Sequence, residues 1–344
     1  MKKHLIIFAA VFAVTIAAPI LFWRSKKPNI VLICIDTLRA DHFTAEHMPL
    51  TYQWAKENAA IYNAAYSNST WTLPSHVSMF SGLLPSEHKV ANQGDKVAPT
   101  FDLLPETLQK KGYTTAGFVE NLWLSAPFGF SRGFHEYIYN AAPQSAFANA
   151  EKFLESAKTP YFIFINTMTV HEWWATLRSY PITDEGFVAA VDNPASGSLY
   201  AEAVSASDKQ VFQFIAAVLK HDPETRIILT SDHGEGLGES EYGYVSKGHH
   251  TYPVPSQTRV PLIISGKPRT EGALFDLRSL KSLIIGEPFP AGAIVSEINY
   301  KDIHYTATIS ERQYAIKESD AKPSNADDIP PDIAAQLKTL GYLN

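Results

Sequence analysis

Asp36, Thr72 and the pair Asp232-His233 are the residues of this chain whose types fit a metal-assisted reaction. Carboxylate oxygens and imidazole nitrogens are common ligands of divalent cations in proteins. A cation held by such residues would polarise the Thr72 hydroxyl, lower its pKa and stabilise negative charge that develops on a bound oxyanion. The residue types therefore predict a hydroxyl nucleophile beside a metal ion.

Two buried strands are expected to bring the ligands together. Residues 28–36 form an apolar, β-branched run that ends in Asp36, and residues 226–231 form a similar run that ends at Asp232. Such runs are typical of strands buried on both faces of a parallel sheet. Open α/β sheets place their ligands at the carboxyl ends of the strands. One carboxylate at a strand end is more often a helix cap, but two such ends with an adjacent Asp-His pair favour a metal site.

A helix start is expected to position Thr72. In the stretch from Ser69 to Gly82, Pro74 is a proline of the kind that a first helical turn tolerates, and Gly82 is a typical stop. The backbone N–H groups of a first turn are unpaired and form a natural anion site. On its own the pattern indicates only a capped helix. Together with the two strand ends that carry metal ligands, the helix start predicts a hydroxyl nucleophile beside a metal ion and an anion site.

Strands and helices alternate along the chain, which predicts an α/β fold with a largely parallel central sheet flanked by helices. The other expected strands are 61–66, 113–119, 160–166 and 260–264, and the expected helices are 48–60, 107–112, 146–156 and 205–220. Residues 120–139 and the glycine-rich segment 234–239 are expected to be loops. The signal weakens from residue 267, where 274–283 is interpreted as helix, 293–309 as short strands and 333–340 as a last helix.

Composition narrows the class of protein. The chain has 344 residues, of which 45% are apolar and 19% charged, as in ordinary globular domains and unlike disordered chains. The formal net charge is -6, and basic residues cluster only near the N-terminus, so nucleic acid is not an expected partner. Cys34 is the single cysteine, which excludes an intramolecular disulfide and a cysteine-cluster metal site.

The N-terminal segment predicts a membrane anchor. The run from His4 to Trp23 carries no formal charge, and its length of about 20 residues matches the ~30 Å hydrocarbon core of a bilayer. Ala17-Ala18 is an alternative signal-peptidase site, but the apolar run continues beyond it. Lysines flank both ends, so the positive-inside rule does not set the orientation. We expect one uncleaved N-terminal transmembrane helix.

Several motifs carry a resemblance to a known superfamily. They are Pro28–Asp41, Thr72–His76 with Ser81-Gly82, Gly112–Val119, Gly129–Phe134, Leu229–Glu239, Arg259–Ile264 and Leu337–Tyr342. With these motifs in this order, the chain resembles the alkaline phosphatase superfamily, and most closely its sulfatase branch. We divide the chain into an anchor at 1–27, a sulfatase-like catalytic domain at 28–266 and a C-terminal edge or cap of the same domain at 267–344.

The resemblance implies a role for each motif residue. Asp36, Asp232 and His233 would bind the metal, and Thr72 would be both nucleophile and metal ligand. His249 stands where relatives place a residue that contacts the substrate or a second metal. These ligand types fit one or two ions of Zn, Mn, Mg or Ca.

Three further residues have weaker assignments. Lys247 would hold the ester oxygens, and a surface lysine is its alternative. His171 follows a buried strand where relatives carry a histidine, and it would protonate a leaving group; a solvent-facing histidine is the alternative. His76 stands at a motif position but is interpreted as a local packing residue.

The departures from the sulfatase pattern point to phosphorus chemistry. Sulfatases need Cys or Ser at the nucleophile position, because that side chain is converted to formylglycine. Thr72 cannot give the aldehyde because its Cβ carries a methyl group. His76 replaces an arginine, and Thr37 replaces a second metal-binding aspartate. Threonine nucleophiles occur in superfamily members that act on phosphorus, and 167–181 and 252–261 are faintly similar to phosphoethanolamine transferases.

We therefore expect a membrane-anchored, metal-dependent enzyme that acts on a phosphate ester or phosphodiester through Thr72 and a covalent phospho-enzyme, by hydrolysis or by transfer. Its substrate would be a small-molecule ester or a lipid or glycan head-group ester, met outside the cytoplasm at a bacterial inner membrane. One alternative is a sulfuric ester hydrolase that works without formylglycine. The other is a catalytically silent, membrane-anchored binding protein.

Overall fold

The computed structural model describes residues 27–139, 145–173, 191–266, 274–290, 292–311, 313–321 and 329–339. The anchor expected at residues 4–23 lies outside these ranges. None of the helices within them combines the length and the hydropathy that a bilayer crossing requires.

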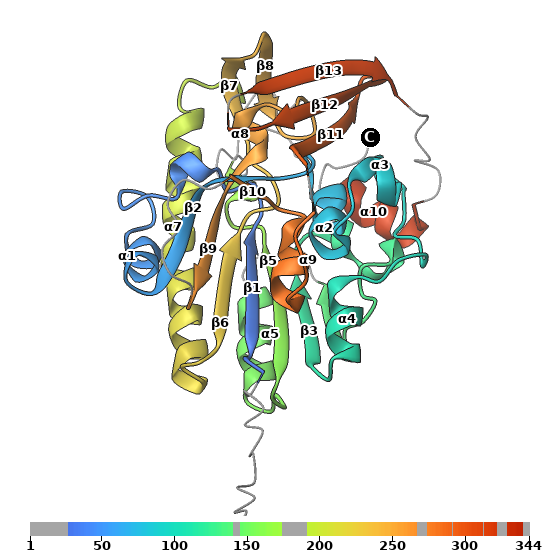
Figure 1. Ribbon diagram of the computed structural model, residues 1–344. Helices are drawn as coiled ribbons and strands as arrows, with labels where there is room; N and C mark the ends of the chain where they lie inside the picture. Colours follow the sequence, from blue (N-terminus) through green and yellow to red (C-terminus); the bar gives the residue numbers. More distant parts are fainter. Residues whose placement is uncertain are drawn as a thin grey trace, which may run out of the picture.

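An eight-stranded sheet forms the centre of the fold (Figure 1). In spatial order its strands are β10 (Leu274–Asp276), β2 (Ala59–Tyr66), β9 (Arg259–Ser265), β6 (Arg226–Thr230), β1 (Ile30–Ile35), β5 (Tyr161–Thr167), β3 (Thr114–Val119) and β4 (Glu136–Tyr139). The β1 strand is parallel to both of its neighbours, with Cys34 opposite Asn166 on one side and Thr230 on the other. The carboxyl ends of β1, β5 and β6 therefore meet at one edge of the sheet.

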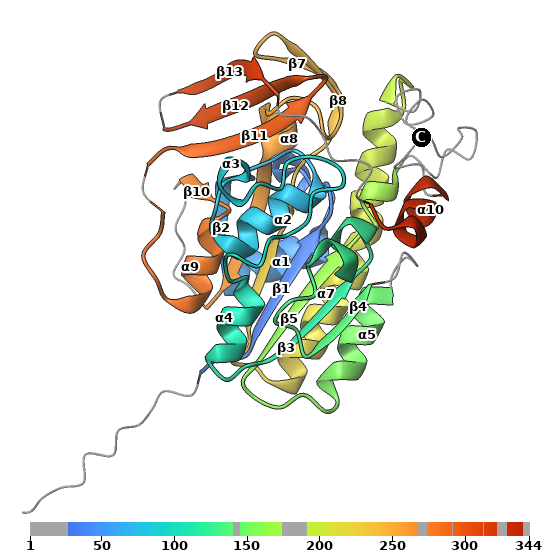
Figure 2. The ribbon, with the colours of Figure 1, turned by 90° about the vertical axis from the view of Figure 1, so that its right-hand side faces the viewer.

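Helices cover both faces of this sheet (Figure 2). On one face lie α2 (Thr72–Ser81), α3 (Pro85–His88), α4 (Leu104–Lys110) and α9 (Ser279–Ile285). The helix α10 (Pro331–Thr339) adds Ile333 and Leu337 to the core of that face. On the other lie α1 (Pro49–Asn58), α5 (Ser145–Leu154) and α7 (Ser196–His221). Alternate β1 side chains enter the two separate cores, which is why this strand is apolar throughout.

The central sheet is largely parallel, as expected, but it is mixed because one strand runs in the opposite direction. The strand expected at 260–264 is β9, and it runs antiparallel to both β2 and β6. After β6 the chain stays at the carboxyl edge, where it forms the hairpin of β7 (Gly236–Glu241) and β8 (Tyr244–Gly248) and the short helix α8 (Pro255–Thr258). Because β9 is entered from that edge without a crossover, it must run back.

The other differences between the expected and the observed secondary structure lie in segments with weak helix or strand propensity. The segment expected to be loop contains the short helices η2 (Leu122–Leu124) and η3 (Ala126–Phe128) and ends in β4. The helix expected at 274–283 is divided between β10 and α9. The short strands expected at 293–309 are present as β11 (Ile294–Tyr300) and β12 (Ile303–Ile309). An unexpected third strand, β13 (Tyr314–Asp320), completes an antiparallel sheet that lies above the edge where β1 ends (Figure 1).

Gly133 provides a test of this packing. Its φ is +79°, and an added Cβ would lie 2.2 Å from the backbone nitrogen of Glu106 in α4. Gly112 has a similar φ of +83° but open space around it. We expect Gly112→Ala to lower the free energy of unfolding by about 1 kcal/mol from backbone strain alone. Gly133→Ala adds a clash with backbone and should cost about 3 kcal/mol or more. Equal losses in urea unfolding would contradict the close contact.

Candidate active site and metal centre

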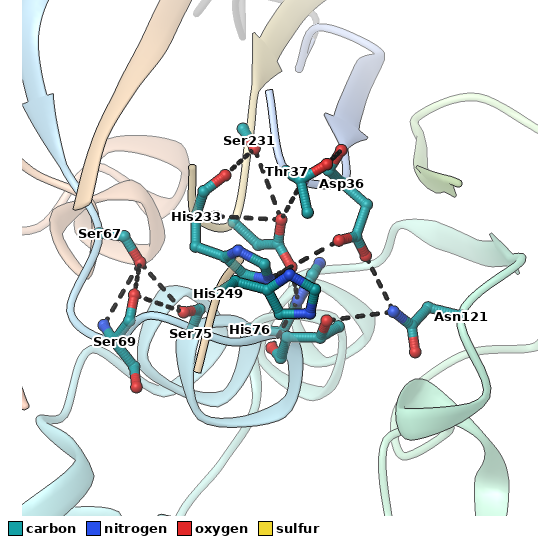
Figure 3. A network of polar contacts seen from close by, with 12 residues as sticks. Asp36, Thr37, Ser67, Ser69, Ser75, His76, Asn121, Ser231, His233 and His249 are labelled. Atoms are coloured by element: carbon teal, nitrogen blue, oxygen red, sulfur yellow. Dashed lines mark hydrogen bonds and ion pairs between the residues drawn. The ribbon is translucent and has the colours of Figure 1, made fainter. Parts of the chain in front are cut away.

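The ligands predicted from sequence meet at the carboxyl edge of the sheet. Asp36 follows β1, and Asp232 and His233 follow β6. One ligand atom of each lies within 4.8 Å of the others, and all three side chains are fully buried. His233 Nε2 is 3.4 Å from Asp232 Oδ2 and 3.7 Å from Asp36 Oδ1. Three residues expected to act together are therefore brought together (Figure 3).

The geometry of this cluster fits a divalent cation. Asp36 Oδ1, Asp232 Oδ2 and His233 Nε2 have no hydrogen-bond partner within the described part of the chain. Buried polar atoms normally have one, so three such atoms in one place fit the binding of a cation. His233 Nδ1 donates to the carbonyl oxygen of Gly234 at 2.9 Å, which leaves Nε2 unprotonated and able to bind metal. The other carboxylate oxygens accept N–H groups, among them the backbone of Thr37.

Without a cation, it costs free energy to keep the ionised carboxylates of Asp36 and Asp232 buried side by side. Burial, and then the charge of Asp232, raises the pKa of Asp36 to about 7. Burial likewise raises the pKa of Asp232 to about 7, and it lowers the pKa of His233 to about 4. Each group is thus held toward its neutral form.

Metal affinity should therefore rise with pH. The cation must displace protons from Asp36 and Asp232, whose pKa values near 7 lie above the ordinary range. We expect the dissociation constant for Zn²⁺ to fall by about tenfold or more between pH 6 and pH 8, with little further change above pH 8. Calorimetry in buffers of different ionisation enthalpy should detect proton release near pH 6. A pH-independent affinity without proton release would contradict this site.

Thr72 lies at the first residue of α2, and its side chain is buried. The residue before it is extended, so α2 begins sharply, and Gly82 ends the helix with a φ of +81° as expected. Thr72 Oγ1 accepts a hydrogen bond from Asn121 Nδ2 at 3.1 Å. The same amide nitrogen donates to Asp36 Oδ2 at 2.9 Å, so a single side chain separates the Thr72 hydroxyl from the ligand cluster.

Sequence reasoning missed Asn121. It lies two residues after the end of β3, in the segment that we expected to be loop. Its position at the end of a buried strand, like Asp36 and Asp232, was the available signal. A second asparagine, Asn166 in β5, also donates to Asp36 Oδ2 at 3.2 Å. The ends of β1, β3, β5 and β6 therefore all contribute to the site.

His76 belongs to the site and is more than a packing residue. Its Nδ1 lies 2.8 Å from the carbonyl oxygen of Thr72, one turn earlier in α2, and 3.5 Å from Asp232 Oδ2. Burial lowers its pKa to about 3, so the ring is neutral at physiological pH. In this state Nδ1–H donates to the carbonyl oxygen of Thr72, and the ring links α2 to the end of β6.

Two histidines expected at the site form a group with His233. The His249 ring lies 4.8 Å from that of His233 and 5.0 Å from that of His171. Burial lowers the pKa of His171. Burial is the largest single influence on His249 and acts to lower its pKa. The charge and hydrogen bond of Glu235, together with the charges of Asp36 and Asp232, outweigh burial and raise that pKa.

Glu235, which sequence reasoning left unassigned, orients this group. The side chain is fully buried. One carboxylate oxygen lies 3.1 Å from His249 Nδ1, and the other accepts the indole N–H of Trp173 at 3.2 Å. Glu235 therefore fixes the orientation of the His249 ring.

The charged groups of Lys247 and Arg39 both form ion pairs with carboxylates of this chain. The Lys247 ammonium forms an ion pair with Asp192, and its side chain is 38% exposed. Contact with substrate oxygens would require exchange of this ion pair.

Arg39 is buried, binds Asp41 through two nitrogens at 2.8 and 3.0 Å and also contacts Glu239. It holds the start of the β7–β8 hairpin against the end of β1.

The fold and the site define the class of protein. A sheet with helices on both faces, with buried carboxylates and a histidine at the carboxyl ends of its strands, is the arrangement expected for an enzyme of the alkaline phosphatase superfamily. The Sulfatase family model matches residues 28–274. The chain therefore belongs to the sulfatase family.

Solved structures agree on the fold at low sequence identity. The phosphonate monoester hydrolase of Agrobacterium radiobacter superposes with a TM-score of 0.63 at 14% identity, over 85% of this chain and 89% of that one. The C-terminal periplasmic domain of EcEptC from Escherichia coli, in complex with Zn, gives 0.57 at 15%, over 80% and 90%.

The same domain of phosphoethanolamine transferase EptC from Campylobacter jejuni gives 0.57 at 17%, over 76% of this chain and 89% of that one. Comparison with curated protein sequences gives no match.

Proposed function

We propose that this protein is a metal-dependent enzyme that cleaves a phosphate ester or phosphodiester through Thr72, and passes the phosphoryl-bearing group to water or to an acceptor alcohol. One observation supports the proposal. Thr72, which cannot become formylglycine, is buried and shares the Asn121 amide with Asp36, a member of the Asp36, Asp232 and His233 cluster. A hydroxyl that attacks phosphorus needs only activation and charge stabilisation.

Asp36, Asp232 and His233 would hold the cation, with Thr72 as the fourth ligand. A divalent cation there supplies Lewis-acid polarisation of the hydroxyl and neutralises charge on the ester oxygens. Zn is the ion to test first, because a neighbour of the same fold was solved with it.

The residues of the chain divide the remaining work. Thr72 Oγ gives its proton to solvent and forms a bond to phosphorus as the ester P–O bond breaks, and the electron pair of that bond leaves on the alcohol oxygen. The leaving oxygen takes a proton from the adjacent pair His171 and His249, whose rings lie 5.0 Å apart. Water or an acceptor alcohol then attacks phosphorus and returns a proton to that pair, the Oγ–P bond breaks with its electron pair on Oγ, and Thr72 takes up a proton from solvent. Lys247 would join the substrate oxygens after exchange of its ion pair with Asp192.

We further propose a cellular location for the protein. The apolar run from His4 to Trp23 would anchor the chain, and the catalytic domain would lie outside the cytoplasm, as do the periplasmic domains of the EptC neighbours. A small-molecule ester or a lipid or glycan head-group ester is the proposed substrate.

Trapping the intermediate tests the proposal. Zn-loaded protein should be mixed with phosphomonoesters and phosphodiesters, quenched within milliseconds and digested. We expect a phosphoryl-containing adduct on the peptide with Thr72. The covalent mechanism would be overturned if the wild type turned over phosphodiesters without forming an adduct and Thr72→Ala kept that turnover.

The Sulfatase family match supports a second candidate, a sulfuric ester hydrolase without formylglycine. Sulfate esters in the same panel separate it from the first. Tight stoichiometric metal with no turnover of either ester class would favour a third candidate, the catalytically silent binding protein.

A further inference from the structure

The Asn121 side chain is locked into one orientation between Thr72 and Asp36. Its Oδ1 accepts the backbone N–H of Trp123 at 3.0 Å, so the amide cannot be reversed without the loss of a buried hydrogen bond. Its own backbone N–H donates to Asn166 Oδ1 at 3.1 Å. The two hydrogens on Nδ2 therefore point in fixed directions, one to the metal carboxylate and one to the nucleophile (Figure 3).

This orientation determines how the lone pairs of the Thr72 oxygen are used. Oγ1 accepts from Asn121 with one lone pair. Loss of the Thr72 proton would leave two more lone pairs, one for the proposed cation and one for attack on phosphorus. An amide N–H contributes most when its acceptor carries negative charge. Thr72 Oγ1 carries such charge when its bond to phosphorus breaks, because the electron pair of that bond stays on the oxygen.

We propose that Asn121 is a catalytic residue of the phosphoryl transfer, and that its N–H stabilises Thr72 Oγ1 as the leaving group when the phosphothreonine breaks down. This inference rests on the proposed function. Breakdown proceeds by attack of water or alcohol on phosphorus, loss of the Oγ–P bond and return of a proton to Oγ1. The proposal predicts that breakdown depends on Asn121 more strongly than formation does.

Asn121→Ala and the control Asn29→Ala test this role. Asn29 is an equally buried asparagine that donates to a carboxylate, Asp222, and accepts a backbone N–H, that of Tyr161. It precedes β1 at the end of the strand away from Asp36. The two replacements remove similar buried hydrogen bonds, but only one of them acts at the site.

Rapid quench with a phosphodiester gives the two rates, at Zn²⁺ concentrations that saturate each protein. We expect Asn121→Ala to slow breakdown by about 10²–10³-fold, so that the Thr72 adduct accumulates in the steady state. Asn29→Ala should keep both rates at wild-type values. Calorimetry provides a second readout, because loss of the bond to Asp36 should weaken Zn²⁺ binding by about 10-fold or more in Asn121→Ala only.

The outcomes separate this inference from the function on which it rests. If the wild type forms the adduct and Asn121→Ala breaks it down at the wild-type rate, the role of Asn121 is wrong and the function stands. An equal loss in Asn29→Ala would also overturn the role, because the effect would then be general. If the wild type forms no adduct and Thr72→Ala retains turnover, the proposed function itself fails.

Discussion

Replacing Thr72 by alanine is expected to lower kcat for a phosphodiester by about four to six orders of magnitude, the loss typical of a nucleophile that acts as a unit with its activating groups. The change removes only the hydroxyl and a methyl group from the first residue of α2, where the hydroxyl accepts the Asn121 N–H. Metal affinity should fall less than kcat, because the three atoms of the Asp36, Asp232 and His233 cluster remain.

Two further variants make this result specific. Thr72→Ser keeps the hydroxyl and should retain much of the activity, with a detectable adduct on the same peptide. Thr51→Ala is the matched control, since Thr51 is also a buried threonine in the first turn of a helix, α1, on the opposite face of the sheet. We expect normal turnover from the properly folded fraction of that variant. Activity in Thr72→Ala within tenfold of the wild type would rule out Thr72 as the nucleophile.

Asp232→Asn is expected to abolish turnover and yet to stabilise the metal-free protein. Burial raises the pKa of Asp232 to about 7, above its value of about 4 in an unfolded chain, so its ionised form costs the folded state free energy. The cost is absent below pH 4 and grows until the pH passes 7. An amide avoids the charge and can donate to His233 Nε2, now 3.4 Å away. We expect about 2 kcal/mol of added stability at pH 8 and little at pH 4.

Thermal unfolding with and without Zn²⁺ measures both effects. The wild type should gain stability on addition of the ion, and Asp232→Asn should not, because one anionic ligand is missing. Asp208→Asn is the contrasting control. Asp208 is also buried, but its oxygens accept the backbone N–H groups of Leu50 and Thr51 at 2.8 Å, so its replacement should destabilise the protein. A metal-free Asp232→Asn that unfolds below the wild type at pH 8 would contradict the charge argument.

The sequence by itself determined the parts of this protein that depend on local pattern. Continuous apolar runs indicated strands buried on both faces, and β1, β5 and β6 have that character. The type of residue at the strand ends indicated Asp36, Asp232 and His233 as one cluster, because parallel strands end at the same edge. Pro74 and Gly82 bounded the Thr72 helix in the same way, through backbone preferences that act within a few residues.

Only the tertiary structure decided which distant groups complete the site. The direction of β9 depends on the path of the chain through the β7–β8 hairpin, which no periodicity encodes. Asn121 meets Thr72 across 49 residues and Asp36 across 85, from a segment with no regular pattern. The bond from Glu235 to His249 likewise requires the hairpin to bring its two ends together. Local sequence fixes burial and backbone preference, whereas the partner of a buried polar atom depends on which strand ends are neighbours in the folded sheet.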